Sequence, residues 1–370
     1  MENDQWKMTN DLIYWIALSS IKDIGPARMR NLLNTFGLPE AVFKATPRGL
    51  KSVEGVGERR ALAIKSFKDW GRIEGILKKC EALGVKIIRY SDPSYPCFLK
   101  EISDSPLIFY AMGDIKEEDR FSIAVVGPRR PTDYGVRVTD MIAGELGRLG
   151  MTVVSGMARG IDTVAHKAAL RKGGRSIAVL GSGLDVPYPP ENAGLMKMIE
   201  ANGSVISEYP LGTKPERENF PRRNRLISGL SLGVLVVEAT GDSGTLITAR
   251  YALEQGREVF AVPGMITSTR SSGTNALIRQ GARLVEKAAD IIEELAPQLK
   301  GFIRERKRCA VTLTEEEKSI TEKLSLEPLH IDELTRQSGL PSYRVLGILT
   351  TLELKGIVKQ SGGKKFYLEM

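Results

Sequence analysis

The turn Gly127-Pro128-Arg129-Arg130 is the first stretch whose residue types and spacing indicate chemistry. It follows the apolar residues 122–126, which predict a buried strand, and open α/β sheets bind ligands at the carboxyl ends of their strands. A dinucleotide-binding turn needs three spaced glycines, whereas here Pro128 removes a backbone donor and the next glycine comes too late. Arginine offers phosphate paired, permanently charged hydrogen bonds. We therefore predict that Gly127, Arg129 and Arg130 bind a phosphate; the alternative is a loop with surface arginines.

A second basic cluster, residues 217–225, interleaves arginines with an aromatic ring. Single-stranded nucleic acid is bound by cations that follow its phosphates and by rings that stack on its unpaired bases. The alternative is a solvated helix start. The residues of this stretch predicted to contact a strand are Arg217, Phe220, Arg222, Asn224 and Arg225, with Arg223 among them in sequence.

Two further turns carry donors for an anion. Ser243, Gly244 and Thr245 follow an apolar strand and open a helix, where backbone N–H groups and hydroxyls can bind a phosphate. They lack the spacing and the lysine of a P-loop, so triphosphate hydrolysis is not indicated, and plain helix capping is the alternative. Gly156 lies in the turn after the second strand and is also predicted to approach the ligand.

Two histidines were considered for acid–base chemistry. Asp162 and His166 stand four residues apart on one helix, but with no nucleophile or metal partner at hand we favour a structural role, with Asp162 as a cap. His330 begins a helix near the C-terminus and is interpreted as a cap or a surface group. We predict no catalytic residue and no metal ligand.

These turns are positioned by alternating strands and helices over residues 121–295. Near-continuous apolar strands between helices predict a parallel sheet covered on both faces, the doubly wound, Rossmann-like α/β class. The apolar runs are SIAVV, MTVVS, SIAVL, SVISE, GVLVVEA and REVFAVP.

Four other segments flank this domain. We predict a helical domain over 1–80, a connector with a short strand or two over 81–120, a basic linker over 296–310, and a winged helix over 311–370. Within the first segment, IKDIGPARMRNLL and VEGVGERRALAIK share an apolar-Gly turn followed by a basic helix. This repeat predicts tandem helix-hairpin-helix turns that can bind phosphate, or else simply tight helix–helix turns.

Composition limits the class of protein. The chain has 370 residues and a formal charge of +8, a mildly basic balance that permits a polyanionic partner. Its three cysteines, Cys80, Cys97 and Cys309, have no zinc-ligand spacing and suit a reducing compartment. No apolar run approaches the length of about 18 residues that a membrane span needs, and the N-terminus is no secretory signal. We expect a cytoplasmic protein with no membrane contact and no cofactor.

Taken together, the motifs resemble those of the DprA/Smf family of DNA-processing proteins over nearly the whole chain. The matching stretches include YPCFLKEISDSP, AVVGPRRPTDYG, VVSGMARGIDTVAHKAAL, AVLGSGLDVPYPPEN, FPRRNRLISGLS, VVEATGDSGTLITARYALEQGREVFAVPG and GTNALIRQGARLV. The resemblance implies a protein that is not an enzyme, binds single-stranded DNA, protects incoming strands and loads the RecA recombinase during natural transformation.

The resemblance also implies roles for particular residues. It assigns DNA binding to the Gly-x-Arg turn, to the Phe-Pro-x-Arg-Asn-Arg stretch and to the Ser-Gly-Thr turn. The residues carried over are Gly127, Arg129, Phe220, Asn224, Arg225, Ser243, Gly244 and Thr245, with Arg217 and Arg222 as neighbours. It further implies a homodimer through the region of Leu277 to Val285. Pro128 and Pro190 depart from the family pattern and leave two contacts in doubt.

Two other functions stay open. The sheet and the SGT turn also resemble those of nucleotide phosphoribohydrolases, with Glu238 as the catalytic acid, although TGDSGT lacks the paired glycines of that group. A sequence-specific repressor is weaker, because the segment PSYRVLGILTTLELKGI carries one arginine and one lysine, few for a major-groove reader.

Overall fold

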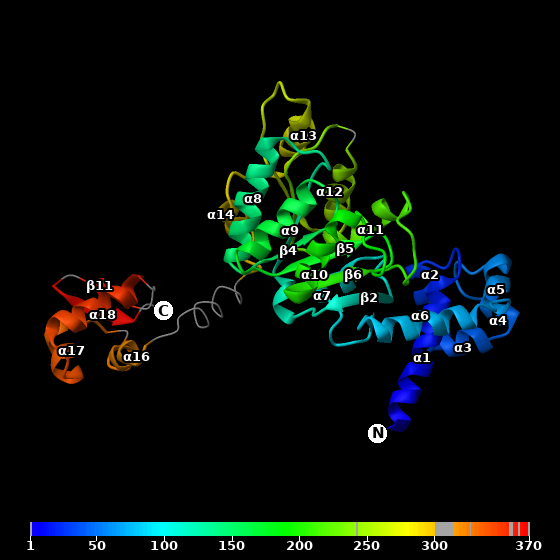
Figure 1. Ribbon diagram of the computed structural model, residues 1–370, viewed down its shortest axis with the longest axis horizontal. Helices are drawn as coiled ribbons and strands as arrows, with labels where there is room; N and C mark the ends of the chain where they lie inside the picture. The colour runs from blue at the N-terminus through cyan, green and yellow to red at the C-terminus, as the bar shows by residue number, and fades with distance from the viewer. Residues whose placement is uncertain are drawn as a thin grey trace. The chain divides into compact units, whose positions relative to one another are not determined.

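The computed structural model describes residues 2–241, 243–299, 314–325, 327–354, 358–361 and 363–368. Within these ranges it describes the side chains of residues 11–353 and 358–368. The chain divides into two compact units, residues 1–297 and residues 298–370, and each is treated by itself (Figure 1). Most of the predicted basic linker, residues 300–310 with Cys309, lies outside the described residues.

The first unit is built on one nine-stranded sheet with the order β1-β2-β6-β5-β4-β3-β7-β8-β9. Strands β3 to β9 run parallel to one another, which confirms the predicted doubly wound sheet. The chain winds outward from β3 to β6 and then returns to place β7 on the other side of β3, so the strand order reverses between β3 and β7. The parallel strands are β3 (Ser122–Val126), β4 (Thr152–Ser155), β5 (Ser176–Leu180), β6 (Gly203–Ser207), β7 (Gly233–Val236), β8 (Glu258–Ala261) and β9 (Arg283–Leu284).

The sheet begins earlier than the sequence predicted. Strands β1 (Lys86–Arg89) and β2 (Ile108–Gly113) lie in the predicted connector, yet β2 pairs antiparallel with β6 and β1 with β2. The sheet therefore starts at Lys86 rather than at residue 121. The prolines of the segment fall in the turns between the two strands and around α7 (Cys97–Glu101), where no ladder hydrogen bond is lost.

Helices cover both faces of the sheet. On one face α11 (Asn219–Gly229) and α12 (Gly244–Glu254) share a core with alternate residues of β3, β5 and β7. On the other, α10 (Ala193–Ala201) packs on β5 and β6 together with α1 and α6 of the N-terminal region. The remaining helices of the sheet domain are α8 (Asp133–Arg148), α9 (Ile161–Arg171), α13 (Ser272–Arg279) and α14 (Ala288–Glu294).

The N-terminal region contains six helices, drawn in blue shades in Figure 1. They are α1 (Glu2–Ser20), α2 (Pro26–Phe36), α3 (Pro39–Lys44), α4 (Pro47–Lys51), α5 (Glu58–Lys65) and α6 (Trp70–Ala82). The two predicted hairpins join α1 to α2 and α4 to α5, and an extended glycine, Gly25 or Gly57, precedes the second helix of each. An arginine at the same place in each repeat, Arg28 or Arg60, donates to a carbonyl of its own hairpin turn.

The second unit is a small helical domain with a three-stranded sheet of order β10-β12-β11. This confirms the predicted winged helix. His330 Nδ1 accepts a hydrogen bond from the Asp332 N–H at the start of α17, as expected for a cap, and Gly339 ends that helix at φ +68°. The elements are α16 (Glu315–Thr321), β10 (Leu329–His330), α17 (Ile331–Ser338), α18 (Ser342–Leu354), β11 (Val358–Ser361) and β12 (Lys365–Leu368). Of the helices that the structure describes in either unit, none combines the length and the apolar character required to span a bilayer.

Candidate nucleic-acid interface

An open cavity of about 460 Å³ lies where the strand order reverses, at the carboxyl ends of the parallel strands. Ligands of doubly wound sheets bind at this place. Its wall is formed by the turn after β3, by the first turns of α9 and α12, and by α11 with the residues before it. The predicted site residues that line it are Gly127, Arg129, Arg217, Phe220, Asn224, Ser243, Gly244 and Thr245.

Arg129 and Phe220 bring a cation and an aromatic ring together at this cavity. The guanidinium carbon of Arg129 lies 5.4 Å from the centre of the Phe220 ring, within the range of a cation–π interaction. Tyr188 also contacts the ring, with 5.5 Å between the ring centres. A nucleotide entering the cavity would thus meet a charge suited to its phosphate and a ring suited to its base.

Arg223 lines the cavity but is not among the residues predicted from the sequence to contact a strand. Its side chain is buried, lines the cavity and donates from Nη1 to the carbonyls of Gly156, at 2.8 Å, and Val179. Burial lowers the pKa of Arg223 to about 10, so the group stays charged near neutral pH. The double arginine in FPRRN was a signal, but sequence alone does not tell which of the two turns inward.

Asp162 lies close to Arg223 and also lines the cavity. Its carboxylate accepts hydrogen bonds from the N–H groups of Gly156 and Ala158, each at 3.2 Å. Burial raises the pKa of Asp162 to about 6, and the nearby Arg223 charge opposes that rise. The carboxylate therefore organises the turn after β4 rather than capping the helix by the usual local pattern.

Glycines in two of the turns allow this close packing. A Cβ atom on Gly127 would lie 2.5 Å from Ile161 Cγ1 of α9. A Cβ atom on Gly156 would lie 2.7 Å from Arg223 Nη2 and 2.9 Å from Asp162 Oδ2. Gly156 itself is absent from the residues that line the cavity, so its contribution is to the packing behind the wall.

The turn before α12 both caps the helix and faces the cavity. Ser243 Oγ accepts a hydrogen bond from the Thr245 N–H at 3.2 Å and donates to Thr245 Oγ1 at 3.0 Å, which caps the helix. The same residues open into the cavity, where the positive end of the helix dipole favours an anion.

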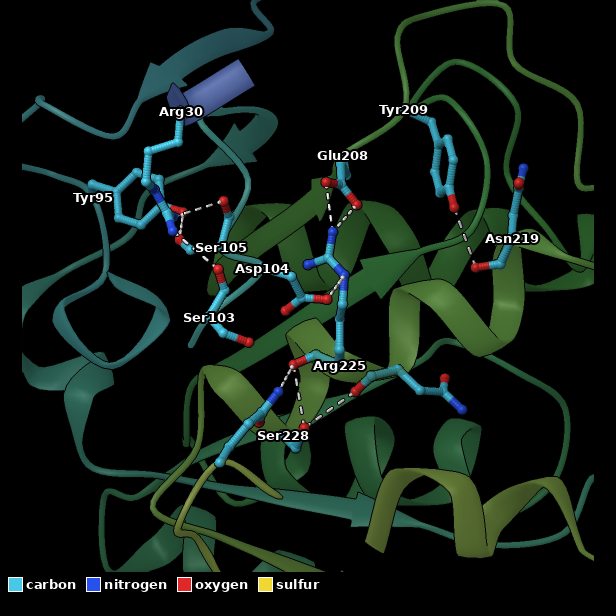
Figure 2. Close-up of polar contacts among 12 residues, drawn as sticks. Arg30, Tyr95, Ser103, Asp104, Ser105, Glu208, Tyr209, Asn219, Arg225 and Ser228 are labelled. Atoms are coloured by element: carbon cyan, nitrogen blue, oxygen red, sulfur yellow. Dashed lines mark hydrogen bonds and ion pairs between the residues drawn. The ribbon is translucent and has the colours of Figure 1, made fainter. Parts of the chain in front are cut away.

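Three predicted arginines do not line the cavity. Arg130 is exposed, and its carbonyl accepts a hydrogen bond from Arg270 Nη1. Arg222 is exposed, and its Nη2 lies 3.7 Å from Glu218 Oε2. Arg225, assigned to DNA contact by the resemblance, is instead buried on another side of α11 between Glu208 and Asp104 (Figure 2). Its two acidic partners already neutralise the guanidinium, so the structure gives it a structural role.

The groups considered for acid–base chemistry are engaged elsewhere. The Glu238 carboxylate is buried and accepts hydrogen bonds from the Thr132 N–H, at 3.0 Å, and from the Thr132 hydroxyl at the start of α8. His166 is buried against Ser176, and burial lowers its pKa to about 3, so it remains neutral over the physiological range. In the part of the chain that the structure describes, no three His, Cys, Asp or Glu side chains gather as a metal site.

Three family profiles match this chain. The profile of the family described as DNA recombination-mediator protein A matches residues 86–296. Profiles for the DprA winged helix domain and for a SAM-like helix-hairpin-helix tandem match residues 304–364 and 16–78. Protein Smf of Synechocystis is 35% identical over 388 aligned residues, which cover 95% of this chain and 98% of that protein.

Solved structures extend the comparison. DNA processing protein A of Streptococcus pneumoniae is 34% identical with a TM-score of 0.65, over 76% of this chain and 96% of the other. DNA processing protein A of Helicobacter pylori, solved to describe its single-stranded DNA binding mode, is 31% identical with a TM-score of 0.52, over 58% of this chain and 96% of the other.

Proposed function

The chain belongs to the DNA recombination-mediator protein A family, the DprA/Smf proteins, and on that premise we propose that it binds single-stranded DNA in the cavity between β3 and β7. The relative from Helicobacter pylori, which is described as binding single-stranded DNA, supports this proposal. The single observation that carries it is the placement of Arg129 over the Phe220 ring at the cavity.

Each part of the cavity has a task in this proposal. Arg129 and Arg217 bind phosphate oxygens, with charge-assisted hydrogen bonds that are stronger than neutral ones. The first turn of α12 offers backbone donors to an adjacent phosphate. Phe220 stacks on a base, which gives preference for unpaired strands because the bases of a duplex are already stacked. Arg223 and Asp162 organise the wall rather than contact the strand.

The role in the cell follows from the family. We propose that the protein processes DNA in natural transformation by protecting single strands and loading a RecA recombinase onto them. Leu284 in the edge strand β9 exposes 42% of its surface, and it supports the proposal of a homodimer through the region of Leu277 to Val285. The protein acts without enzymatic turnover and in the cytoplasm in this proposal. The engagement of Glu238 with Thr132 weighs against the phosphoribohydrolase alternative.

The first test is fluorescence anisotropy with a labelled oligonucleotide of about 30 nucleotides, which exceeds the usual site size of a single-strand binder. Single-stranded and duplex forms are titrated at several salt concentrations. We expect tighter binding of the single strand and an affinity that falls steeply with salt, because bound phosphates release counterions. Equal or negligible binding of both forms would overturn the proposal, and an assay for release of base from a nucleoside monophosphate would then follow.

A further inference from the structure

One face of α11 lines the cavity. A second face of the same helix carries Arg225. Phe220, Arg223 and Asn224 line the cavity, whereas Arg225 is only 6% exposed and does not line it. Arg225 Nη2 lies 2.6 Å from both carboxylate oxygens of Glu208, and Nε lies 3.0 Å from Asp104 Oδ2. The position of α11 thus depends on two carboxylates from outside the helix.

Glu208 and Asp104 are held in different ways. Glu208 directly follows β6, so the sheet positions it. Asp104 lies in the loop between α7 and β2 and is nearly half exposed. The position of Asp104 therefore depends on what holds the loop 102–106.

Arg30 of α2 holds that loop from its far side. Arg30 Nη1 donates to the Ser103 carbonyl at 3.0 Å and Nη2 donates to the Ser105 carbonyl at 3.4 Å, which are the neighbours of Asp104 on either side. The Tyr95 hydroxyl, itself buried, lies 2.7 Å from Ser105 Oγ. Arg30 therefore donates to the carbonyls of both residues that flank Asp104. We refer to the ion-paired group of Arg225, Glu208 and Asp104 as the clamp.

The loop also contacts α11 directly. A Cβ atom on Gly229 in the last turn of α11 would lie 3.0 Å from Ile102 Cγ2 and 3.3 Å from Leu99 Cδ1. Because the helix and the loop touch without spare room, a displacement of the loop is transmitted to the helix.

We propose that Asp104 is a positioning residue for the cavity and that Arg30, Asp104 and Arg225 couple the helix-hairpin-helix region to DNA binding. This inference rests on the proposed function. Arg225 Nη1 is buried and has no hydrogen-bond partner among the described residues, so Arg225 depends on its two carboxylates alone. Removing Asp104 leaves a buried cation with a single partner, which favours a shift of α11 and of the cavity residues it carries. A partner that binds α2 and displaces Arg30 would change the affinity of the cavity for DNA by the same route.

The coupling is tested in the full-length protein with the variants Arg30→Ala, Asp104→Ala and the double variant. Arg59→Ala is the matched control, because Arg59 is an exposed arginine of the same region whose ion pair, with Asp23 at 3.0 Å, does not reach the loop 102–106. Asp104→Asn keeps an acceptor for Arg225 and tests whether the charge itself is required. Affinity for a labelled single strand is measured by anisotropy, and hydrogen exchange of residues 219–229 is measured without DNA.

Each single variant is expected to raise Kd by roughly 2- to 30-fold, the range of residues that couple sites without touching the ligand. The double variant should bind the single strand no more weakly than the single variant of lower affinity, because the two substitutions disrupt the same clamp. Exchange in α11 should accelerate in both variants and remain unchanged in Arg59→Ala. A partial recovery in Asp104→Asn relative to Asp104→Ala would identify positioning rather than loss of fold.

The outcomes separate this inference from the proposed function. Wild-type affinity together with wild-type exchange in Arg30→Ala overturns the coupling, and so do effects that multiply in the double variant. If the wild-type protein does not bind the single strand at all, the proposed function fails, and exchange in α11 still decides whether the clamp positions the helix.

Discussion

Arg129 and Phe220 come from different segments, one directly after β3 and the other from α11, and their side chains meet with 5.4 Å between the guanidinium carbon and the ring centre. At the cavity the cation and the ring are thereby within the range of a direct cation–π interaction. Neither segment creates this arrangement alone, because α11 must be held on the sheet for the two to meet.

Replacing Arg129 by alanine should weaken single-strand binding and flatten its salt dependence. Each phosphate contact contributes about 0.7 to the slope of log affinity against log salt for single strands, so we expect a loss of about that size. Arg130→Ala is the control, because Arg130 is the adjacent arginine and does not line the cavity. Anisotropy titrations across salt measure both. Equal slopes for the two variants would remove Arg129 from the interface.

Replacing Phe220 by leucine should remove base stacking while keeping an apolar side chain. Stacking of a base on an aromatic ring contributes about 1–3 kcal/mol, so the loss in affinity should lie near that range. Phe98→Leu serves as the control, since Phe98 is also half-buried and has Arg257 over its ring, but lies away from the cavity. A salt slope that is unchanged in Phe220→Leu would separate stacking from phosphate contact, whereas equal affinities for wild type and variant would exclude stacking.

Gly156→Ala should destabilise the fold by about 1–3 kcal/mol, because its methyl group would press on the buried Arg223 and Asp162. The contrasting variant is Gly75→Ala in α6, where no atom lies within 4 Å of the added methyl group. There we expect a stabilisation of about 0.5–1 kcal/mol, since glycine is costly inside a helix. Unfolding in urea gives both values, and a neutral Gly156→Ala would mean that the wall of the cavity can relax.

Single-strand affinity should rise as pH falls through about 6, because the pKa of Asp162, raised from its ordinary value of 3.8 by burial, lies near 6. Protonation there removes a negative charge from the wall of the cavity. The free energy of unfolding should change with pH in the same direction. Because burial raises the pKa of Asp162, the contribution of this group to stability is complete below about pH 4 and is lost as pH rises through 6. His166, whose pKa is lowered to about 3, stays neutral in this window.

Anisotropy and urea unfolding between about pH 3.5 and 7.5, a window that spans the ordinary and the raised pKa of Asp162, check both signs. Asp162→Asn should flatten the two profiles, whereas Asp140→Asn, on the exposed face of α8, should leave them unchanged. Profiles of equal steepness in the two variants would assign the dependence to another group.

Leu284→Arg should convert the proposed dimer to a monomer in sedimentation equilibrium. The substitution places a charge in an exposed apolar position of the edge strand β9, where a symmetric partner would bury it beside its own copy. Leu253→Arg is the control, because Leu253 is even more exposed, at 63%, but lies on α12. A dimer that survives Leu284→Arg would place the interface elsewhere.

The strands and the turns that end them were predictable because they are local. The apolar runs ending at Val126 and Ser155 mark β3 and β4, and the residues that follow them mark the edge where the cavity lies. Arg223 and Arg225 show where this reasoning stops. They are the same residue type, two positions apart on one helix, and only the distant partners Gly156, Glu208 and Asp104 decide which one lines the cavity.

The sequence predicts a short strand or two in the segment 81–120, but their place in the main sheet was harder to predict for a related reason. Residues 86–89 and 108–113 are short, and prolines and turns separate them, so their local pattern is that of a connector. What makes them sheet is the edge of β6: β2 pairs with it across a long interval of sequence, and β1 pairs with β2. Pairing of this kind is a tertiary effect that overrides local preference.

The reversal of strand order between β3 and β7 also sets the order in which the walls of the cavity are made during synthesis of the chain. The turn after β3 leaves the ribosome early, but the walls contributed by α11 and by Ser243 to Thr245 follow only after β4, β5 and β6 have been made. A nascent chain that ends before Arg217 holds the arginine turn without α11 and without the turn before α12. Since domains fold as units once their sequence has emerged, the proposed DNA site is completed only when nearly the whole sheet exists.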